Sequence, residues 1–475
     1  MGTEGKRVVV IGGGPGGYPA AIRAAQLGLD VVLIDRGGLG GACLHRGCIP
    51  TKLLLKETSD YRKAATFTSD WAGLAIPAAD VDGMMRRKAQ VVGQLERGTR
   101  GLLRKNGVRV VAGTASFIDP SRVLVAETGE VVLSSTFIVA TGSAPARLPV
   151  EGSDLPRVVD SDTALSIERV PRSVAIIGGG VIGVEFAQMF RNLGADVTIV
   201  EMLPRLLASE DDDVSGALQG AMESSGIAVR TGVTVERIGK TPAGLRLEFR
   251  GGGAVHRIDA GIVMAAVGRK PVLECLNPGN AGLILENGAI RVNARMETGV
   301  PGIYAVGDAV GGLMLAHKAT MEGECAAQNA AGVPTVASYV AIPRVAYTDP
   351  EVACVGLTEA EARVRHDDVR IGKFPFSMSG RAILEGVTHG FAKVIAEGET
   401  GCVLGAAIVG RQAAQAIGEA SLAVRLEATV GDLADLVHPH PTFSEALREA
   451  ALDADGRAIH MPPVSKSGAV FAFGR

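Results

Sequence analysis

One local pattern occurs in two distant parts of the chain. Each copy begins with an apolar segment, Arg7–Ile11 or Ser173–Ile177, and continues with three glycines spaced Gly-x-Gly-x-x-Gly. An apolar run of this kind is typical of a parallel strand buried on both faces, and closely spaced glycines allow the backbone a tight turn into a helix. The glycines are Gly12, Gly14 and Gly17 in the first copy and Gly178, Gly180 and Gly183 in the second. Each copy therefore predicts a strand, a turn and a helix in this order.

A second strand is expected after each helix, and it leads to an acidic residue, Asp35 in the first copy and Glu201 in the second. Amides of the glycine turn and the positive end of the helix bind a pyrophosphate, while the acid accepts hydrogen bonds from ribose hydroxyls. One such motif is a weak signal, but two copies in complete context predict two dinucleotide sites. The carboxylate of Glu201 would repel a 2′-phosphate, which favours NAD over NADP at the second site.

Two cysteines, Cys43 and Cys48, closely follow the first copy in the run Gly41–Lys52. Such a pair beside a bound redox cofactor can pass electrons by cycling between a disulphide and two thiols. The alternatives are buried structural cysteines or a pair of metal ligands, but a structural metal site needs about four ligands. We expect no metal site, since no second close cysteine pair occurs in the sequence. The remaining cysteines, which are expected to be small buried side chains, are Cys275, Cys325, Cys354 and Cys402.

Charge and composition narrow the class of protein further. The net charge is −3 and the 475 residues contain six cysteines, too few for a disulphide scaffold. No basic stripe supports nucleic-acid binding, and no apolar run approaches the ~20 residues of a membrane span. No signal peptide is recognised at the start of the sequence, so a reducing, cytoplasmic location is expected.

The motifs resemble those of the pyridine nucleotide–disulphide oxidoreductases, and the resemblance extends over essentially the whole chain. Within this family, the chain is most similar to members that oxidise dihydrolipoamide. The motifs that carry the resemblance are the two glycine fingerprints, Gly41–Lys52, Ala140–Gly142, Gly307–Asp308, Met314–Ala319, Glu322–Gly323, His438–Thr442 and Ser444–Glu445. Two departures are Asp35, where glutamate is usual, and the run Ala42…Leu44-His45-Arg46, where Thr…Leu-Asn-Val is typical.

The resemblance implies an α/β fold with two Rossmann-like dinucleotide-binding domains and a C-terminal α+β dimerisation domain. Short alternating segments and helical stretches after about residue 342 agree with such a last domain on an antiparallel sheet. The expected parts are an FAD-binding domain over 1–150, an NAD-binding domain over 151–271, a central part over 272–345 that completes the FAD domain, and an interface domain over 346–475.

The resemblance also implies the site residues. Cys48 would lie against the flavin as a thiolate, and Cys43 would exchange with substrate. Attack on a disulphide needs a thiolate, so His440 is the candidate base, oriented by Glu445. Lys52 and Glu185 would form an ion pair near the flavin. The expected cofactor-binding residues are Gly12, Gly14, Gly17, Asp35, Lys52, Thr141, Gly142, Gly178, Gly180, Gly183, Glu185, Glu201, Gly268, Asp308 and Ala316.

The implied reaction oxidises protein-bound dihydrolipoamide to lipoamide with FAD and NAD+. The implied assembly is a homodimer in which His440 of one chain completes the site of the other. Its partners would be lipoyl domains of 2-oxo acid dehydrogenase or glycine cleavage complexes, where the chain could also serve as a peripheral assembly subunit. Mercuric and large thioredoxin reductases are disfavoured because the last cysteine is Cys402, and NADPH-dependent glutathione-type reductases because of Glu201.

Overall fold

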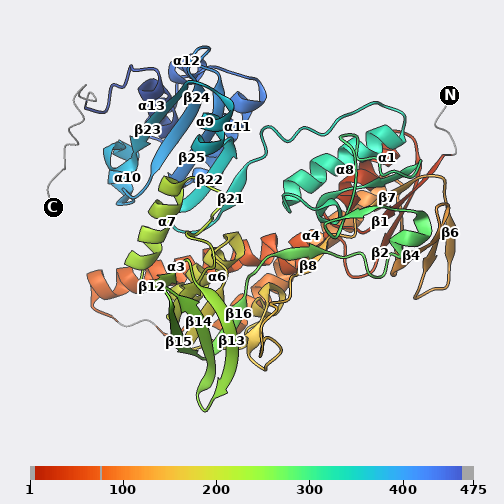
Figure 1. The fold of residues 1–475 in the computed structure, drawn as a ribbon, viewed down its shortest axis with the longest axis horizontal. Coiled ribbons are helices and arrows are strands. Elements are labelled where there is room, and N and C mark those ends of the chain that lie inside the picture. Colours follow the sequence, from red (N-terminus) through yellow and green to blue (C-terminus); the bar gives the residue numbers. More distant parts are fainter. Residues whose placement is uncertain (1–5, 75–76, 463–475) are drawn as a thin grey trace. The chain divides into compact units, whose positions relative to one another are not determined.

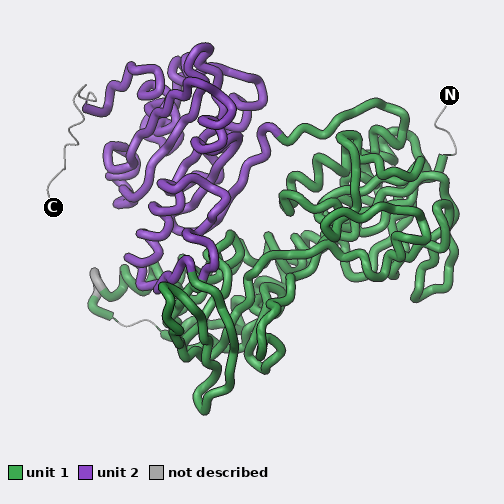
Figure 2. The backbone as a smooth tube through the Cα atoms, in the orientation of Figure 1, with its two compact units in different colours: residues 1–200, 233–339 green, residues 201–232, 340–475 purple. Residues whose placement is uncertain are grey.

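A computed structural model describes residues 6–74 and 77–462 of the chain. The chain divides into two compact units (Figure 2). The first contains residues 1–200 and 233–339, and the second contains residues 201–232 and 340–475. The C-terminal stretch 463–475 of the expected interface domain lies outside the described residues.

A parallel five-stranded sheet forms the first half of unit 1. Its order is β20-β7-β1-β2-β3, and β1 follows the sequence-predicted strand over all its residues. The strands are β1 (Arg7–Ile11), β2 (Asp30–Asp35), β3 (Arg109–Ala112), β7 (Phe137–Val139) and β20 (Ile303–Ala305). All five strands run in the same direction, so the turns that follow β1, β7 and β20 meet at one edge of the sheet.

The last strand of this sheet comes from far along the chain. After β20, the 3₁₀-helix η2 (Gly307–Val310) leads to α8 (Ala316–Ala330), and α8 packs against α1 (Gly17–Gln26), as Figure 1 shows. The region predicted to complete the first nucleotide domain thus supplies one of its strands. The boundaries between the four expected parts stay a prediction.

A second parallel sheet forms the other half of unit 1, with β11, β10, β16 and β9 side by side in this order. Helix α6 (Val181–Asn192) follows β10, so the second sequence motif has the strand–turn–helix–strand form expected of it. The strands are β9 (Val158–Val159), β10 (Ser173–Ile177), β11 (Asp196–Val200) and β16 (Ile262–Ala265).

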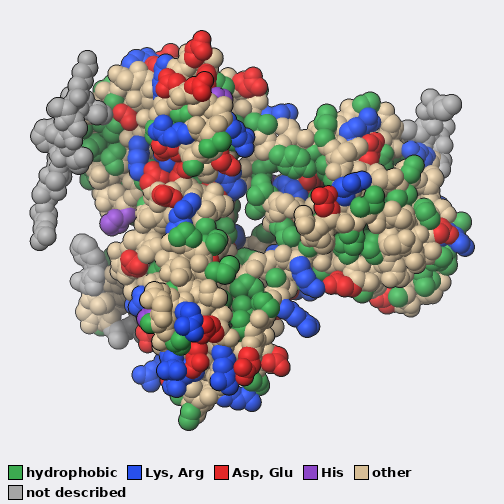
Figure 3. Space-filling model, viewed as in Figure 1, with side chains coloured by type: hydrophobic (Ala, Val, Ile, Leu, Met, Phe, Trp, Pro, Cys, Tyr) green, Lys and Arg blue, Asp and Glu red, His purple; other side chains and the backbone are tan. Residues whose placement is uncertain are grey.

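An antiparallel meander of β13 (Thr234–Thr241), β14 (Gly244–Gly251) and β15 (Ala254–Ala260) extends unit 1. Opposite charges pair across its strands, for example Arg246 with Asp259 at 2.7 Å, and Figure 3 shows both signs interspersed over it. The remaining elements of unit 1 are α2 (Gly41–Arg46), α3 (Cys48–Ala72), α4 (Val81–Lys105), β4 (Ala115–Asp119), β5 (Arg122–Val125), β6 (Val131–Leu133), β8 (Ser143–Pro145), α5 (Ser161–Ala164), β17 (Arg269–Pro271), η1 (Pro278–Ala281), β18 (Leu285–Glu286) and β19 (Ala289–Ile290).

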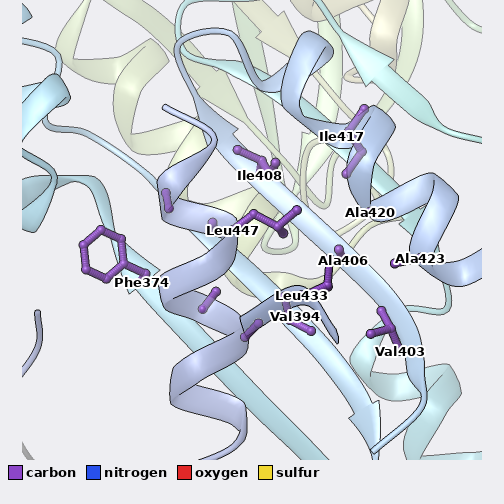
Figure 4. Packing of buried hydrophobic residues seen from close by; sticks show 14 of the residues in the cluster. Phe374, Val394, Val403, Ala406, Ile408, Ile417, Ala420, Ala423, Leu433 and Leu447 are labelled. Atoms are coloured by element: carbon purple, nitrogen blue, oxygen red, sulfur yellow. The ribbon is translucent and has the colours of Figure 1, made fainter. Parts of the chain in front are cut away.

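Unit 2 is built on an antiparallel sheet with the order β21-β22-β25-β24-β23. Helices α11 and α13 pack on it, and Figure 4 shows part of the core, in which Leu447 of α13, Ile408 and Val394 are buried. The elements are α7 (Asp212–Ser224), β12 (Ile227–Arg230), β21 (Arg344–Ala346), β22 (Glu351–Gly356), α9 (Glu359–Arg365), β23 (Val369–Pro375), η3 (Phe376–Met378), α10 (Gly380–Glu385), β24 (Phe391–Glu397), β25 (Val403–Gly410), α11 (Ala413–Arg425), α12 (Val430–Asp435) and α13 (Glu445–Ala454).

A buried lysine holds the 201–232 segment of unit 2 against this sheet. The side chain of Lys393 is 1% exposed, and its Nζ lies 2.7 Å from a carboxylate oxygen of Asp211 and 2.7 Å from one of Asp213. Burial without a partner would disfavour each of these charges, so the group is stable only as a set. The segment is therefore part of unit 2 by ionic contacts as well as by packing.

These elements confirm the predicted α/β class, with two parallel sheets that each carry a glycine motif and a C-terminal α+β domain on an antiparallel sheet. Within residues 6–74 and 77–462, no helix is both long and apolar enough to cross a bilayer.

Candidate redox and cofactor sites

The two cysteines of the motif lie at the junction of two helices. Cys43 is in α2, Cys48 is the first residue of α3, and Gly47 separates the helices. Both cysteines are free thiols, and the Cys43 thiol donates a hydrogen bond to the sulfur of Cys48. Cys48 also lies at the positive N-terminal end of a 25-residue helix, which stabilises the thiolate form of its side chain.

This contact makes the two thiols unequal. The hydrogen bond from Cys43 lowers the pKa of Cys48 to about 7, against the opposing effect of burial and with help from the charge of Lys52. The same hydrogen bond raises the pKa of Cys43 far above its usual range, and burial adds to that rise. Cys48 is therefore the thiolate of the pair and Cys43 its proton carrier.

Lys52 lies one helical turn after Cys48 and is bound by a buried carboxylate. Its Nζ donates to both oxygens of Glu185 at 2.8 Å, and the Glu185 side chain is 4% exposed. Glu185 comes from α6, the helix of the second glycine motif. The predicted ion pair is thus formed, and it joins the helix of the cysteine pair to the half of unit 1 that contains the second glycine motif.

The glycines of the first motif divide into two kinds. A Cβ atom on Gly12 would lie 2.2 Å from the carbonyl oxygen of Ala140, and one on Gly17 would lie 1.7 Å from the carbonyl oxygen of Gly12. These two glycines are required by the protein's own packing. A Cβ on Gly14 would meet only the Cα of Gly41, at 3.8 Å, so the space in front of Gly14 is open to a ligand.

The second motif repeats this division. Cβ atoms on Gly178 and Gly183 would lie 2.3 Å and 1.9 Å from backbone oxygens, whereas one on Gly180 would have nothing within 4 Å. Gly268, in the turn after β16, also faces open space. The middle glycine of a dinucleotide fingerprint is the one that admits the pyrophosphate, so both turns fit such a group.

Other polar groups at the first site also fit a bound dinucleotide. The hydroxyl of Thr141 is buried without a hydrogen-bond partner among the described residues. Beside it, Gly142 has φ +71° and open space around its Cβ position. Ala316 begins α8, a 15-residue helix, whose N-terminal end carries a partial positive charge. A buried unpaired hydroxyl and a positive helix end are features that suit FAD.

The two acidic residues of the motifs are held by backbone amides. Asp35 accepts hydrogen bonds from the amides of Gly13 at 2.8 Å, Gly37 at 3.1 Å and Gly38 at 2.8 Å. Glu201 accepts one from the amide of Leu203 at 2.6 Å. Asp35, which is shorter than the usual glutamate, therefore also closes the turn after β2.

A hydrogen-bonded chain that the sequence did not predict surrounds Asp308. Ser143 donates to its Oδ2 at 2.5 Å, and Arg269 donates from Nε to the hydroxyl of Ser143 at 2.8 Å. Ser143 and Arg269 directly follow Gly142 and Gly268, so the available signal was their place beside motif glycines. Together they fix Asp308 at the edge of the first sheet.

The two unusual residues between the cysteines have partners of their own. The Nε2 atom of His45 is 3.0 Å from the carbonyl oxygen of Leu39, and Arg46 pairs with Asp162 at 3.6 Å. Burial raises the pKa of Asp162, against the charges of Arg269 and Arg46. The thiolate of Cys48 is favoured by Cys43 and Lys52. His45 and Arg46 therefore contact Leu39 and Asp162 and not the thiolate.

The candidate base lies in unit 2. The Nδ1 atom of His440 is 2.8 Å from Oε1 of Glu445, and Glu445 also accepts from the amide of Thr442 at 2.7 Å. Burial alone would raise the pKa of Glu445, but the Thr442 amide and the His440 ring lower it overall. The His440 side chain is 78% exposed, so Nε2 faces away from Glu445 and is available to a substrate.

Of the four cysteines that were expected to be buried, only some are buried in the structure. Cys325 and Cys354 are buried, Cys402 is intermediate, and Cys275 is exposed. The prediction was wrong for Cys275, which precedes Leu276 and lies on the turn before η1. Within the described ranges, no three or more His, Cys, Asp or Glu side chains are grouped so as to hold a metal ion.

Comparison with known proteins identifies the class. Residues 6–323 match the pyridine nucleotide-disulphide oxidoreductase family, and residues 342–451 match the dimerisation domain of that family. The chain belongs to the pyridine nucleotide-disulphide oxidoreductase family. The dimerisation domain supports a homodimer.

Its relatives include several dihydrolipoyl dehydrogenases. One from Bacillus subtilis is 40% identical over 459 residues, which cover 95% of this chain and 99% of the relative. One from Thermus scotoductus is 44% identical over 462 residues, which cover 96% and 98%. The resemblance stated from the motifs is therefore confirmed.

Solved structures agree on the fold. The Cu(II) complex of the HOCl-induced flavoprotein disulfide reductase RclA from Escherichia coli matches with a TM-score of 0.84 at 27% identity, over 95% of this chain and 99% of that one. LpdA from Mycobacterium tuberculosis matches with a TM-score of 0.85 at 26% identity, over 94% and 99%. The chain is thus a flavoprotein oxidoreductase with FAD and NAD as cofactors, as predicted.

Proposed function

We propose that this protein oxidises dihydrolipoyl groups to lipoyl disulphides and delivers the electrons through the Cys43–Cys48 pair and FAD to NAD+. The observation that carries the proposal is the unequal cysteine pair, one low-pKa sulfur beside one thiol that donates to it. Relatives named dihydrolipoyl dehydrogenase match it over nearly their whole length, which supports the substrate.

The pKa difference favours one order of bond changes. In the oxidised enzyme, a substrate thiolate attacks the sulfur of Cys43, forms a mixed disulphide and releases Cys48. The thiol with the lower pKa leaves faster, and the pKa of Cys48 is lowered to about 7. The second thiolate of the substrate then attacks the substrate sulfur that is bonded to Cys43. This step closes the lipoyl ring and releases Cys43. Two electrons thereby pass from substrate to the cysteine pair.

Each substrate thiol must lose its proton before it attacks. His440 takes the proton on Nε2, while its Nδ1–H donates to Glu445 at 2.8 Å, a contact that orients the ring and stabilises its charged form. Glu445 is itself held by the Thr442 amide. This arrangement supports a role for His440 as the general base.

The cofactor residues follow from the two glycine turns. We assign the turn with Gly14, together with Asp35, Thr141, Gly142 and Asp308, to FAD. FAD held there would supply two-electron redox chemistry between the cysteine pair and NAD+. Lys52 would hold its positive charge, oriented by Glu185, beside the flavin and the thiolate of Cys48. Gly12 and Gly17 of the same glycine turn, together with Ala316 at the start of α8, would complete the FAD site.

We assign the second glycine turn to NAD+. Gly180 leaves room for the pyrophosphate, Gly178 and Gly183 shape the turn, and Gly268 faces the same open edge. The carboxylate of Glu201 would accept hydrogen bonds from a ribose and disfavour a 2′-phosphate.

The proposed assembly is a homodimer in which His440 of the partner subunit completes the site at Cys43. The macromolecular partners we propose are the lipoyl domains of 2-oxo acid dehydrogenase or glycine cleavage complexes, and the proposed location is the cytoplasm. The dimerisation-domain match supports the homodimer, and the names of the relatives support the lipoyl partners.

An anaerobic titration tests the reaction. The purified yellow protein is reduced with dihydrolipoamide and then given NAD+, while the visible spectrum is recorded. We expect a long-wavelength charge-transfer band that depends on Cys48, followed by formation of NADH. Serine variants at Cys43 and Cys48 serve as controls and should not be reduced by dihydrolipoamide. Reduction by NADPH but not by dihydrolipoamide would refute the proposed substrate and direct the search to another disulphide.

A further inference from the structure

A buried carboxylate in the middle of α8 has no role in the proposed chemistry. The side chain of Glu322 is 0% exposed. It accepts hydrogen bonds from the amide of Gly307 at 2.8 Å, from the hydroxyl of Tyr339 at 2.7 Å and from the ammonium of Lys318 at 3.1 Å. All three partners are donors, so each of these contacts uses a carboxyl oxygen of Glu322 as the acceptor.

Lys318 closes this network from one turn earlier on the same helix. Its side chain is 4% exposed. Besides Glu322, its ammonium donates to the carbonyl oxygens of Gly307 at 3.3 Å and Gly311 at 3.0 Å. An ammonium has three donors, and here each has an acceptor. The pair is therefore a closed, neutral set inside the protein, the condition under which buried charges are tolerated.

Tyr339 acts as a hydrogen-bond donor in this network. Burial raises the pKa of the Tyr339 hydroxyl, and the hydrogen bond to Glu322 raises it further. The hydroxyl thus keeps its proton and donates it to the carboxylate.

The network holds the turn that contains Asp308. Gly307 and Gly311, which flank this turn, have φ of +70° and +72°, a conformation that glycine adopts without strain. Glycines carry no side chain that could anchor the turn, so its backbone groups are fixed by Lys318 and Glu322 instead. Among the described residues, only Ser143 donates to the Asp308 carboxylate, and it does so at Oδ2. The other oxygen, Oδ1, is left for a ligand.

The same helix is also attached to the first glycine turn. The hydroxyl of Thr320 donates to the carbonyl oxygen of Pro15 at 3.0 Å. A Cβ on Gly323 would lie 2.1 Å from the carbonyl oxygen of Gly16, so the two backbones are in close contact there. One helix, over Lys318–Gly323, therefore touches both turns that face the proposed FAD site.

We propose that the buried Lys318–Glu322 pair is a positioning device for FAD. It fixes the distance between the glycine turn at Gly14 and the carboxylate of Asp308, so that a pyrophosphate and a hydroxyl-bearing part of one FAD molecule reach both. Neither residue touches the cofactor. The inference rests on the assignment of FAD to the first glycine turn, and it is independent of the identity of the disulphide substrate.

The first test compares two carboxylates on the same helix. Glu322→Gln removes the charge from the network, while Glu324→Gln changes an exposed carboxylate two residues further on. The apo-proteins are titrated with FAD in a calorimeter, and the visible circular dichroism of the bound flavin is recorded. We expect the dissociation constant to rise roughly tenfold or more in Glu322→Gln, since a buried lysine loses its counter-charge, and to stay within twofold of wild type in Glu324→Gln.

A double variant separates positioning from stability. Lys318→Met combined with Glu322→Gln removes both charges, and neutral replacement of a buried pair commonly restores stability. We expect its melting temperature to recover relative to Glu322→Gln, while the affinity for FAD and the dichroism of the flavin remain altered. Recovery of wild-type FAD affinity together with the melting temperature would refute the proposal and leave the pair a purely structural element.

Tyr339→Phe tests the proposal even if the charge variants fail to fold. It removes one hydrogen bond to Glu322 and keeps both charges. A rise of a few-fold in the dissociation constant for FAD is expected, and an unchanged constant would overturn the inference. None of these measurements uses dihydrolipoamide, so failure of the proposed substrate and failure of this proposal give different results.

Discussion

The thiol of Cys43 donates its hydrogen to the sulfur of Cys48, and the ammonium of Lys52 stands one helical turn further along the same helix as Cys48. The two sulfurs therefore differ in charge, although the two cysteines are only five residues apart in the chain. A difference of this kind determines which sulfur leaves and which is attacked in thiol–disulphide exchange.

The first prediction concerns the pH dependence of this pair. The pKa of Cys48 is lowered to about 7, so in the reduced protein its thiolate persists above pH 7 and is protonated as the pH falls below it. The rate of iodoacetamide labelling at Cys48, followed by peptide mass spectrometry between pH 5 and 10, should rise with a midpoint near 7. Cys43 should be labelled only at much higher pH.

Lysine variants test the cause of that midpoint. Lys52→Met removes a positive charge beside the thiolate and should move the midpoint upward. Lys56→Met, one turn further along α3, removes an exposed lysine that pairs with Asp60 and should leave the midpoint in place. Equal shifts in both variants would contradict the local role of Lys52.

The second prediction separates the glycines of the first motif. Gly12 has φ +104° and no room for a Cβ, so Gly12→Ala should destabilise the fold by about 1–3 kcal/mol or more. Gly14→Ala faces open space and should leave the melting temperature close to that of wild-type protein while it weakens FAD binding. The measurements are thermal unfolding of the apo-proteins and calorimetric titration with FAD. Tight FAD binding by a stable Gly14→Ala variant would argue against the pyrophosphate at this turn.

The third prediction concerns His440. Replacement by asparagine should lower kcat with dihydrolipoamide by about 10²–10⁴-fold, the usual contribution of a general base, with FAD content unchanged. The chain offers a matched control in His460, whose Nδ1 lies 2.9 Å from Glu449 and whose side chain is also exposed. His460→Asn should retain activity. Comparable losses in both variants would show that an exposed His–Glu pair near α13 affects activity without acting as the base.

The fourth prediction concerns Lys393. Lys393→Met would leave Asp211 and Asp213 without their buried cation and should cost about 3–5 kcal/mol in the free energy of unfolding. Lys373 contacts the same Asp213 at 2.9 Å but is 40% exposed, so Lys373→Met should cost at most about 1 kcal/mol. Urea unfolding at pH 7 measures both.

The sign of the pH effect at this cluster follows from Asp213. Burial alone would raise the pKa of Asp213, but the ammonium groups of Lys393 and Lys373 lower it overall. A carboxylate with a lowered folded-state pKa stabilises the fold above its unfolded-state pKa, and that stability is lost as the pH falls. Wild-type protein should therefore lose more stability than Lys393→Met on acidification below about pH 4, and equal losses would contradict this account.

The parts of the fold that the sequence predicted are those with strong local signals. Strands β1 and β10 have the predicted ends because an apolar run stops at a glycine whose backbone conformation ends the strand. The meander was missed although β14 alternates buried Leu245, Leu247 and Phe249 with charged residues, a period-two pattern that identifies a half-buried strand.

The site was predictable where motifs specify it and not where contacts come from distant parts of the chain. Cys43, Cys48, His440 and Glu445 stand in recognisable runs. The contact of Glu322 with the amide of Gly307, by contrast, depends on how α8 packs, and no spacing rule identifies it. The partner of Arg46, Asp162 on α5, is likewise visible only once the chain has folded.

The ionic attachment of residues 201–232 to the C-terminal sheet has a consequence for exchanging parts between relatives. A chimaera joined at residue 340 would pair Asp211 and Asp213 of one parent with the lysines of another. A relative without a cation at the position of Lys393 would leave Asp211 and Asp213 of the hybrid without this partner. The part that must be exchanged as one piece is therefore discontinuous in the sequence. It consists of Glu201–Gly232 together with Val340 and the residues that follow it.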